Sequence, residues 1–287
     1  MGSFTRQTEP LIRGIQRSTV LDSIGRALAV SFARIVRPGT LKDLFSGTWL
    51  GHPAHPMLTD VPIGAWTSAV TLDLLGGEAG RKAADRLIGL GVLAAVPTAV
   101  TGLSDLADVT EREERTVGVA HALGNVATIA LFGLSYALRR KGRRGAGVAL
   151  SMAGSVLASG AAYLGGHLVY RQVVGPTRAL DGPIPDWTPV LDGESLVEGK
   201  PRRVPVGAAQ IMLYREAGRT YALSNRCSHR GGPLHKGEVR DGRVTCPWHL
   251  SVFSMEDGSV IRGPAAAPQP TYEVREREGK IEIRQRA

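Results

Sequence analysis

The sequence predicts a multidomain chain in which an all-α four-helix transmembrane bundle is followed by an all-β domain. Two observations predict this division. The first part is rich in Ala, Gly, Leu and Val, with its charges in short patches, whereas the second is strand-like and rich in Arg. A chain of 287 residues is also long enough for two domains. The expected parts are an amphipathic basic segment at 1–44, the bundle at 45–172, a Pro/Gly linker at 173–185 and the β domain at 186–287.

Four long apolar stretches make up the predicted bundle, at about 57–76, 84–106, 116–138 and 146–170. Each is near the roughly 20 residues that cross a hydrocarbon core. The segments between them hold nearly all of the charge, as spanning helices require. The pattern favours an integral, multi-pass protein of a bacterial inner membrane, with the lipid bilayer as a partner, over a soluble four-helix domain.

Two helical faces can be read from the spacing of residues. In the last stretch, Gly154, Ala158, Ala162 and Gly166 recur every four residues, which predicts a small-residue packing stripe. A further amphipathic helix is predicted at 19–36, either at the membrane interface or as a cap over the bundle. Its predicted apolar face contains Val20, Ile24, Leu28 and Ile35, with Asp22, Arg26 and Arg34 turned away.

Histidines gather near one end of the predicted bundle. If the helices run up and down, the helix ends that carry His55, His121 and His167 share one membrane side. One interpretation is a haem b or other metal ligated by a pair such as His121 and His167, because imidazole suits iron and helix bundles house such cofactors. The other is that His55 stands at the membrane interface beside a helix-starting proline, and that His121 and His167 hydrogen-bond to Asp60 or Asp105. Both interpretations stay open.

Two short boxes in the second part contain the only cysteines of the chain, Cys227-Ser228-His229 and Cys246-Pro247-Trp248-His249. Thiolates select iron–sulfur clusters, copper(I) or zinc, and two Cys with two His also suit a tetrahedral zinc site. Short strands surround the boxes and predict a small β-sandwich or barrel. They are expected at 202–206, 210–215, 219–224, 243–246, 251–254, 271–277 and 280–285.

The residues around the boxes resemble the Rieske [2Fe–2S] family. They read Cys-Ser-His-Arg-Gly-Gly-Pro-Leu-His and Cys-Pro-Trp-His-Leu-Ser-Val-Phe, followed by Gly263-Pro264. The resemblance implies that the two cysteines hold the inner iron and the two histidines the outer iron of one cluster. The implied ligands are Cys227, His229, Cys246 and His249, and Gly263 and Pro264 would form the loop that covers the cluster.

The resemblance also bears on the reduction potential. High-potential relatives have a Ser and a Tyr after the second His that donate hydrogen bonds to the sulfurs, and a cysteine pair that bridges the loops. Here Ser251 is present, Phe253 replaces the Tyr, the bridge is absent, and Leu250 stands where glycine is usual. The pattern is closer to Rieske ferredoxins and predicts a low to intermediate potential.

The first part resembles a second family, DUF2231, whose bacterial membrane domains have four predicted helices and are sometimes fused to a Rieske domain. The resemblance rests on a His-Pro-x-x-Pro-Ile-Gly pattern, found with extra residues at 55–64, and extends over about 45–172. The resemblance implies a topology of four membrane helices, but it indicates no reaction or cofactor.

Net charge is +9, but no basic stretch is interleaved with aromatics, so nucleic acid is not expected as a partner. The predicted function is a membrane-anchored carrier of single electrons between a donor and a redox partner, such as a quinol, a reductase or a cytochrome. The alternatives are a membrane oxidoreductase with haem b in the bundle and a redox or iron sensor. The short stretch after His249 leaves no room for a mononuclear-iron oxygenase domain on this chain. A homo-oligomer and either orientation of the β domain remain open.

Overall fold

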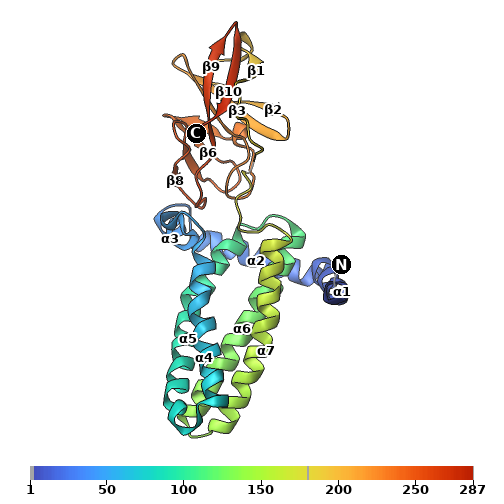
Figure 1. Ribbon diagram of the computed structural model, residues 1–287, viewed down its shortest axis with the longest axis vertical. Coiled ribbons are helices and arrows are strands. Elements are labelled where there is room, and N and C mark those ends of the chain that lie inside the picture. Colours follow the sequence, from blue (N-terminus) through green and yellow to red (C-terminus); the bar gives the residue numbers. More distant parts are fainter. Residues whose placement is uncertain (1–2, 180, 287) are drawn as a thin grey trace. The chain divides into compact units, whose positions relative to one another are not determined.

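A computed structural model describes residues 3–179 and 181–286 (Figure 1). The chain divides into two compact units. The helical unit consists of the residues up to Val36 together with Ala54–Val174, and the β unit consists of Arg37–Pro53 together with the residues from Gly175 onward. The β unit therefore includes a short segment, Arg37–Pro53, that lies between two parts of the helical unit in the sequence.

Long helices build the helical unit. They are α1 (Ser3–Arg17), α2 (Thr19–Ile35), α4 (Ala54–Leu75), α5 (Gly77–Ala107), α6 (Arg112–Arg140) and α7 (Arg144–Tyr170). The last four cover the four predicted apolar stretches. Among the described residues, α5, α6 and α7 are long and apolar enough to cross a membrane, and α4 does not belong to this set. The prediction of four transmembrane spans is therefore not confirmed, whereas three helices could span.

Two aromatic rings join the helical hairpins α4–α5 and α6–α7. Trp66 of α4 stacks on Phe132 of α6, with 4.2 Å between ring centroids and 2° between ring planes. Glycines make room for both rings, because a Cβ at Gly91 would lie 2.3 Å from the Trp66 indole nitrogen and one at Gly154 would lie 3.0 Å from the Phe132 ring. The small residues of α5 and α7 thus let the helices approach closely.

The packing face of α7 differs from the predicted stripe. Gly154 is buried as expected, but Ala162 is exposed and Ala161 is buried instead. A step of four residues turns a helix of 3.6 residues per turn by more than a full circle, so a strict four-residue repeat drifts off one face. The buried residues Gly147, Ser151, Gly154 and Ala161 follow one another at separations of four, three and seven residues, which keep them on one face of the helix.

Helix α2 packs against α6 through an ion pair that its sequence pattern did not predict. Ile24 and Leu28 pack on the apolar cluster as expected, whereas Val20 is exposed. Asp22 was expected on the outer face, yet it is buried and accepts hydrogen bonds from the Arg115 guanidinium at 3.0 and 2.6 Å. The contacts of α2 are thus those of a cap on the helical unit, because the buried carboxylate is paired within it.

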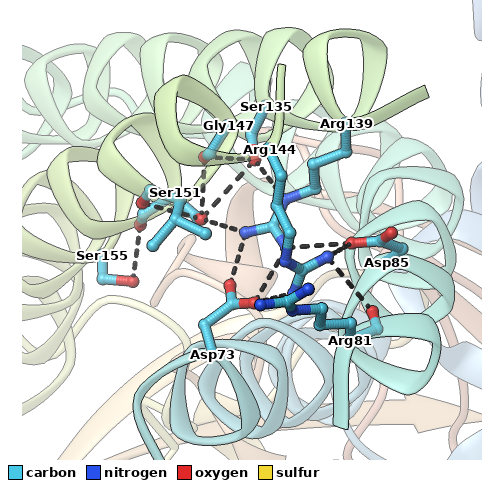
Figure 2. Close-up of polar contacts among 10 residues, drawn as sticks. Asp73, Arg81, Asp85, Ser135, Arg139, Arg144, Gly147, Ser151 and Ser155 are labelled. Atoms are coloured by element: carbon cyan, nitrogen blue, oxygen red, sulfur yellow. Dashed lines mark hydrogen bonds and ion pairs between the residues drawn. The ribbon is translucent and has the colours of Figure 1, made fainter. Parts of the chain in front are cut away.

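Four charged side chains join the two hairpins near the α4–α5 and α6–α7 turns (Figure 2). We call Asp73, Asp85, Arg139 and Arg144 the Asp–Arg network. The acids come from α4 and α5 and the arginines from α6 and α7. Arg139 contacts both carboxylates, and Arg144 contacts Asp85 at 2.6 Å and also Asp73. Ser135 and Ser151 accept further hydrogen bonds from Arg139, at 3.1 and 2.8 Å.

The β unit contains two antiparallel sheets. One has six strands in the order β1-β10-β9-β4-β3-β2, and the other has four in the order β5-β6-β7-β8. The strands are β1 (Thr188–Asp192), β2 (Arg202–Val206), β3 (Ala209–Glu216), β4 (Arg219–Ser224), β5 (Glu238–Arg240), β6 (Arg243–Thr245), β7 (Val252–Ser254), β8 (Val260–Arg262), β9 (Thr271–Arg277) and β10 (Lys280–Gln285). All seven predicted strands are confirmed, and β1, β5 and β8 were missed.

Strand β3 separates two hydrophobic cores. Ile211 and Leu213 face one core, and Met212 and Tyr214 face the other, because successive side chains of a strand point to opposite sides. The second core also contains Cys227, Cys246 and the wholly buried Phe253. Both cysteine-bearing loops are therefore attached to one rigid core.

Candidate metal centre

Two loops with the same backbone pattern present the four predicted ligands. The first follows β4 and contains Cys227 and His229; the second connects β6 to β7 and contains Cys246 and His249. In the first, the Cys227 N–H donates to the Gly232 carbonyl at 2.9 Å, and the Gly231 N–H donates to the Cys227 carbonyl at 2.8 Å. These two backbone hydrogen bonds join the end of the first loop to its cysteine.

The second loop repeats this pattern position by position. The Cys246 N–H donates to the Ser251 carbonyl at 2.8 Å, and the Leu250 N–H donates to the Cys246 carbonyl at 3.1 Å. Leu250 therefore occupies the place that Gly231 has in the first loop, and both have left-handed backbones, with φ of 62° and 76°. Glycine adopts this conformation freely and leucine does not. The departure at Leu250 leaves the loop geometry intact but places a bulky side chain in a strained position.

The sulfurs and the imidazoles form separate pairs. Both thiols are buried, and they share a hydrogen bond that lowers the pKa of Cys246 to about 7 and, together with burial, raises the pKa of Cys227 well above its usual range. Backbone N–H groups of Trp248 and His249 bond to the Cys246 sulfur, and those of His229 and Arg230 bond to the Cys227 sulfur. Such donors stabilise thiolates, which are the form that binds metal.

The rings of His229 and His249 lie edge to face, with 5.0 Å between their centroids. Both are half-buried, so they lie nearer the surface than the sulfurs do. Burial lowers the pKa of His229 well below its usual value, and the positive charges of His249, Arg230 and Lys42 act in the same direction. A neutral imidazole keeps a lone pair for a metal ion. Among the described residues, no group of three or more His, Cys, Asp or Glu side chains is arranged around a single metal ion.

The loop between β8 and β9 covers the two ligand loops. Gly263, Pro264 and Ala265 are buried there, and the Gly263–Pro264 peptide is cis. The Ala265 N–H donates to the Ser251 hydroxyl at 3.0 Å, which ties this loop to the second ligand loop. Gly263 and Pro264 therefore lie where the sequence predicted a covering loop.

Gln269 ties the same loop to the first ligand loop, and sequence reasoning missed it. Its buried amide donates to the carbonyls of Ser224 and Arg226, both at 2.7 Å, and its carbonyl accepts from the Ser228 N–H at 2.9 Å. Gly232 was also missed, although a Cβ there would lie 2.7 Å from the Cys246 sulfur. A polar residue among prolines at 268–270 was the one available signal for Gln269.

In the helical unit, the structure brings together two of the three singled-out histidines. The rings of His55 and His121 lie 6.4 Å apart, centroid to centroid, with an interplanar angle of 90°. Nδ1 of His55 lies 2.9 Å from the Thr98 carbonyl, and Nδ1 of His121 lies 2.8 Å from the Ala161 carbonyl. In the described part of the chain, no ring contact joins His167 to this pair. The predicted bonds to Asp60 or Asp105 are replaced, for His121, by a backbone carbonyl and by Asn125.

The two-sheet fold and its paired Cys/His loops define an iron–sulfur domain of the Rieske type. The Rieske [2Fe-2S] domain model matches residues 186–273, and the model of a predicted membrane protein, DUF2231, matches residues 51–178. The chain therefore belongs to the Rieske [2Fe–2S] family and combines that domain with a DUF2231 domain. Both resemblances predicted from the sequence are confirmed, and the Rieske domain supports a [2Fe–2S] cluster as the cofactor.

Curated relatives match the β domain. The 3-phenylpropionate/cinnamic acid dioxygenase ferredoxin subunit of Photorhabdus laumondii is 33% identical over 91 residues, which are 31% of this chain and 86% of that protein. Apoptosis-inducing factor 3 of Mus musculus is 33% identical over 91 residues, 32% of this chain, and the chain spans only 15% of that protein. A solved ferredoxin of carbazole 1,9a-dioxygenase from Nocardioides aromaticivorans is 25% identical and covers 35% of this chain and 98% of its own, with a TM-score of 0.33. Homology to ferredoxin subunits implies electron transfer for the domain.

Ser251, which the sequence predicts to tune the reduction potential, is wholly buried in the second ligand loop. Because it accepts the Ala265 N–H, its own proton is available for donation, and a donor near a cluster sulfur stabilises the reduced state. We expect Ser251→Ala to shift the midpoint potential to a more negative value in a redox titration followed by EPR. Ser259→Ala, at an exposed serine of the same unit, serves as the control. An unchanged potential in Ser251→Ala would show that the hydroxyl donates elsewhere.

Proposed function

We propose that this protein is a membrane-anchored carrier that accepts one electron from a donor and passes it to a redox partner. The observation that supports this most directly is the separation of the site into a buried sulfur pair and a half-buried imidazole pair. In the proposal, Cys227 and Cys246 hold the inner iron, and His229 and His249 hold the outer iron. When bound, a [2Fe–2S] cluster supplies one-electron redox chemistry.

The residues of the chain supply three further elements of this proposal. The backbone N–H groups that bond to the sulfurs hold the negative charge of the thiolates. The buried covering loop, fixed by Ser251 and Gln269, excludes water from the sulfur side. The two histidines form the exit for the electron, because they lie nearer to the surface of the domain than the two cysteines do. No bond to a substrate forms or breaks in this function.

The proposed partners follow from the relatives and from the helical unit. The relatives are ferredoxin subunits of dioxygenases, so a reductase is the proposed soluble donor and an oxygenase the proposed soluble acceptor. A helical unit with three helices that could cross a membrane adds a quinol as the alternative donor. We propose that this unit anchors the carrier in the cytoplasmic membrane.

The test measures electron flow through the purified full-length protein in detergent. The protein is mixed under anaerobic conditions either with NADH and the flavin reductase of a Rieske dioxygenase or with duroquinol. Reduction of added cytochrome c then measures electron transfer out of the protein. The wild type is expected to mediate cytochrome c reduction from one of these donors, and Cys246→Ser, which lacks one thiolate, is expected to lose it. A wild-type protein that holds the cluster but mediates from neither donor would contradict the carrier function.

A washing experiment tests the anchor. The full chain is expected to stay in the membrane fraction after extraction with alkaline carbonate and to leave it only in detergent. Release by carbonate alone would contradict membrane insertion.

If reduction of the cluster changed the protease sensitivity of the helical unit without any electron flow, the sensor alternative would be favoured instead.

The His55–His121 pair supports a second candidate function, a membrane oxidoreductase with haem b in the helical unit. Both Nδ1 atoms are engaged by backbone carbonyls, an arrangement typical of ligating histidines. It leaves Nε2 of His55 for a metal, whereas Nε2 of His121 lies 3.1 Å from the Asn125 amide nitrogen, which a metal would have to displace. Gly102 and Gly165 lie against the two rings, where a Cβ would come within 2.7 and 3.0 Å. A haem Soret band in the purified protein that disappears in His55→Ala and persists in His52→Ala would establish this function. Its absence from freshly purified wild-type protein would exclude it.

A further inference from the structure

The segment between α2 and α4 packs on the loop that covers the candidate metal centre. This cap segment, residues 37–53, contains α3 (Thr40–Ser46) and the short helix η1 (Thr48–Leu50), and it belongs to the β unit. Residues 37–50 lie outside both ranges matched by the family models.

Two hydrogen bonds fix the cap segment on the covering loop. The Gly263 N–H donates to the Asp43 carboxylate at 2.8 Å, and the Thr48 hydroxyl donates to the Ala265 carbonyl at 3.1 Å. The covering loop and the cap segment approach this closely because residue 263 is glycine. A Cβ there would lie 2.3 Å from the Thr48 hydroxyl and 2.8 Å from the Asp43 carboxylate. The covering loop is thus held from one side by Ser251 and from the other by the cap segment.

The same contact brings two opposite charges to the metal centre. Lys42 is buried, with only 6% of its surface exposed, although lysine is rarely buried. Burial and the charges of His249 and Arg230 lower the pKa of His229, one of the proposed ligands of the outer iron, and the charge of Lys42 adds a smaller contribution in the same direction. Asp43 is half-buried and holds its negative charge against Gly263. Charges in such partly desolvated positions are screened much less than surface charges.

We propose that Lys42 and Asp43 of the cap segment set the reduction potential of the cluster in opposite directions. This inference rests on the proposed binding of the cluster by this site. Reduction adds one negative charge, so the ammonium of Lys42 stabilises the reduced state and raises the potential, and the carboxylate of Asp43 lowers it. Both residues act through the charge they place beside the centre and do not bind iron.

The experiment is a mediated redox titration of the full-length protein in detergent, followed by EPR, and it needs no electron-transfer partner. Lys42→Met is expected to make reduction about tenfold less favourable, which is a shift of 59 mV to a more negative midpoint for one electron. Asp43→Asn, which keeps an oxygen acceptor for the Gly263 N–H, is expected to shift the midpoint to a more positive value. Lys42→Arg keeps the charge and is expected to stay near the wild type.

A charge-matched control separates a local from a general effect. Lys200→Met removes one positive charge from an exposed loop of the same unit and is expected to leave the midpoint unchanged. Shifts of Lys42→Met and Asp43→Asn in the same direction would indicate that a loosened cap segment, not its charges, alters the centre, and this would overturn the proposal. Unchanged midpoints in both would overturn it as well. A failure of the carrier function leaves these midpoints measurable, so the two proposals fail separately.

Discussion

Replacing His229 by alanine is expected to abolish the Rieske visible absorbance and EPR signature, and the purified protein is expected to lose its stoichiometric iron and acid-labile sulfide. The structure gives the reason. His229 is half-buried beside His249, and its lowered pKa keeps it neutral and able to bind iron. In the proposed assignment, the loss of one of two imidazoles leaves the outer iron without a full set of ligands, and metal binding and the folding of a metal site are coupled.

His235→Ala is the matched control for this prediction. His235 lies in the same loop, but its Nδ1 pairs with the Asn225 side chain at 2.9 Å, so the variant is expected to keep the full signature. Metal analysis by mass spectrometry and a sulfide assay accompany the spectra. A wild-type protein that contains zinc and no acid-labile sulfide would contradict the ligand assignment, as would a His229→Ala protein with an unchanged spectrum.

Replacing Arg139 by methionine is expected to destabilise the helical unit by about 3–5 kcal/mol, the cost of leaving a buried charge without its partner. The side chains of Arg139 and Asp73 are each only 1% exposed, and Arg139 is bonded to both carboxylates of the Asp–Arg network. Methionine fills a similar volume but cannot pair with Asp73. The measurement is thermal unfolding of the full chain in detergent, followed by circular dichroism at a helix wavelength.

Arg140→Met provides the matched control, because Arg140 is the exposed neighbour of Arg139 and its loss is expected to change stability by no more than about 0.5 kcal/mol. A double-mutant cycle with Asp73→Ala tests the pairing itself. The double variant should lose much less stability than the two single losses added together, since each single change already breaks the contact. Additive losses, or equal melting of Arg139→Met and Arg140→Met, would refute a stabilising role for the network.

Most of the candidate metal centre could be predicted from the sequence. The proposed ligands occur at short spacings, Cys-x-His and Cys-x-x-His, that place both side chains of each box on one tight loop. The repeated backbone bonds around Cys227 and Cys246 then follow from those loops alone. Gln269 could not be predicted, because its role depends on which strand ends meet in the folded domain.

The histidines of the helical unit show where this kind of prediction stops. The sequence placed His55, His121 and His167 near one end of the bundle, which is a matter of helix length and direction. Which of them meet depends on the rotation of each helix about its axis, and a shift of one residue turns a side chain by about 100°. The structure brings His55 to His121 and shows Gly102 and Gly165 against their rings.

The sequence by itself determined the order of a helical part and a β part, most of the strands, and the two boxes that identify a Rieske domain, since these depend on residues a few positions apart. Only the tertiary structure showed that Arg139 and Arg144, which read as loop charges, pair with Asp73 and Asp85, and that residues 37–53 pack on Gly263. Such contacts join residues far apart in the chain. No local period encodes them, because the partner of a buried charge is chosen by which elements pack together and by the cost of leaving that charge unpaired.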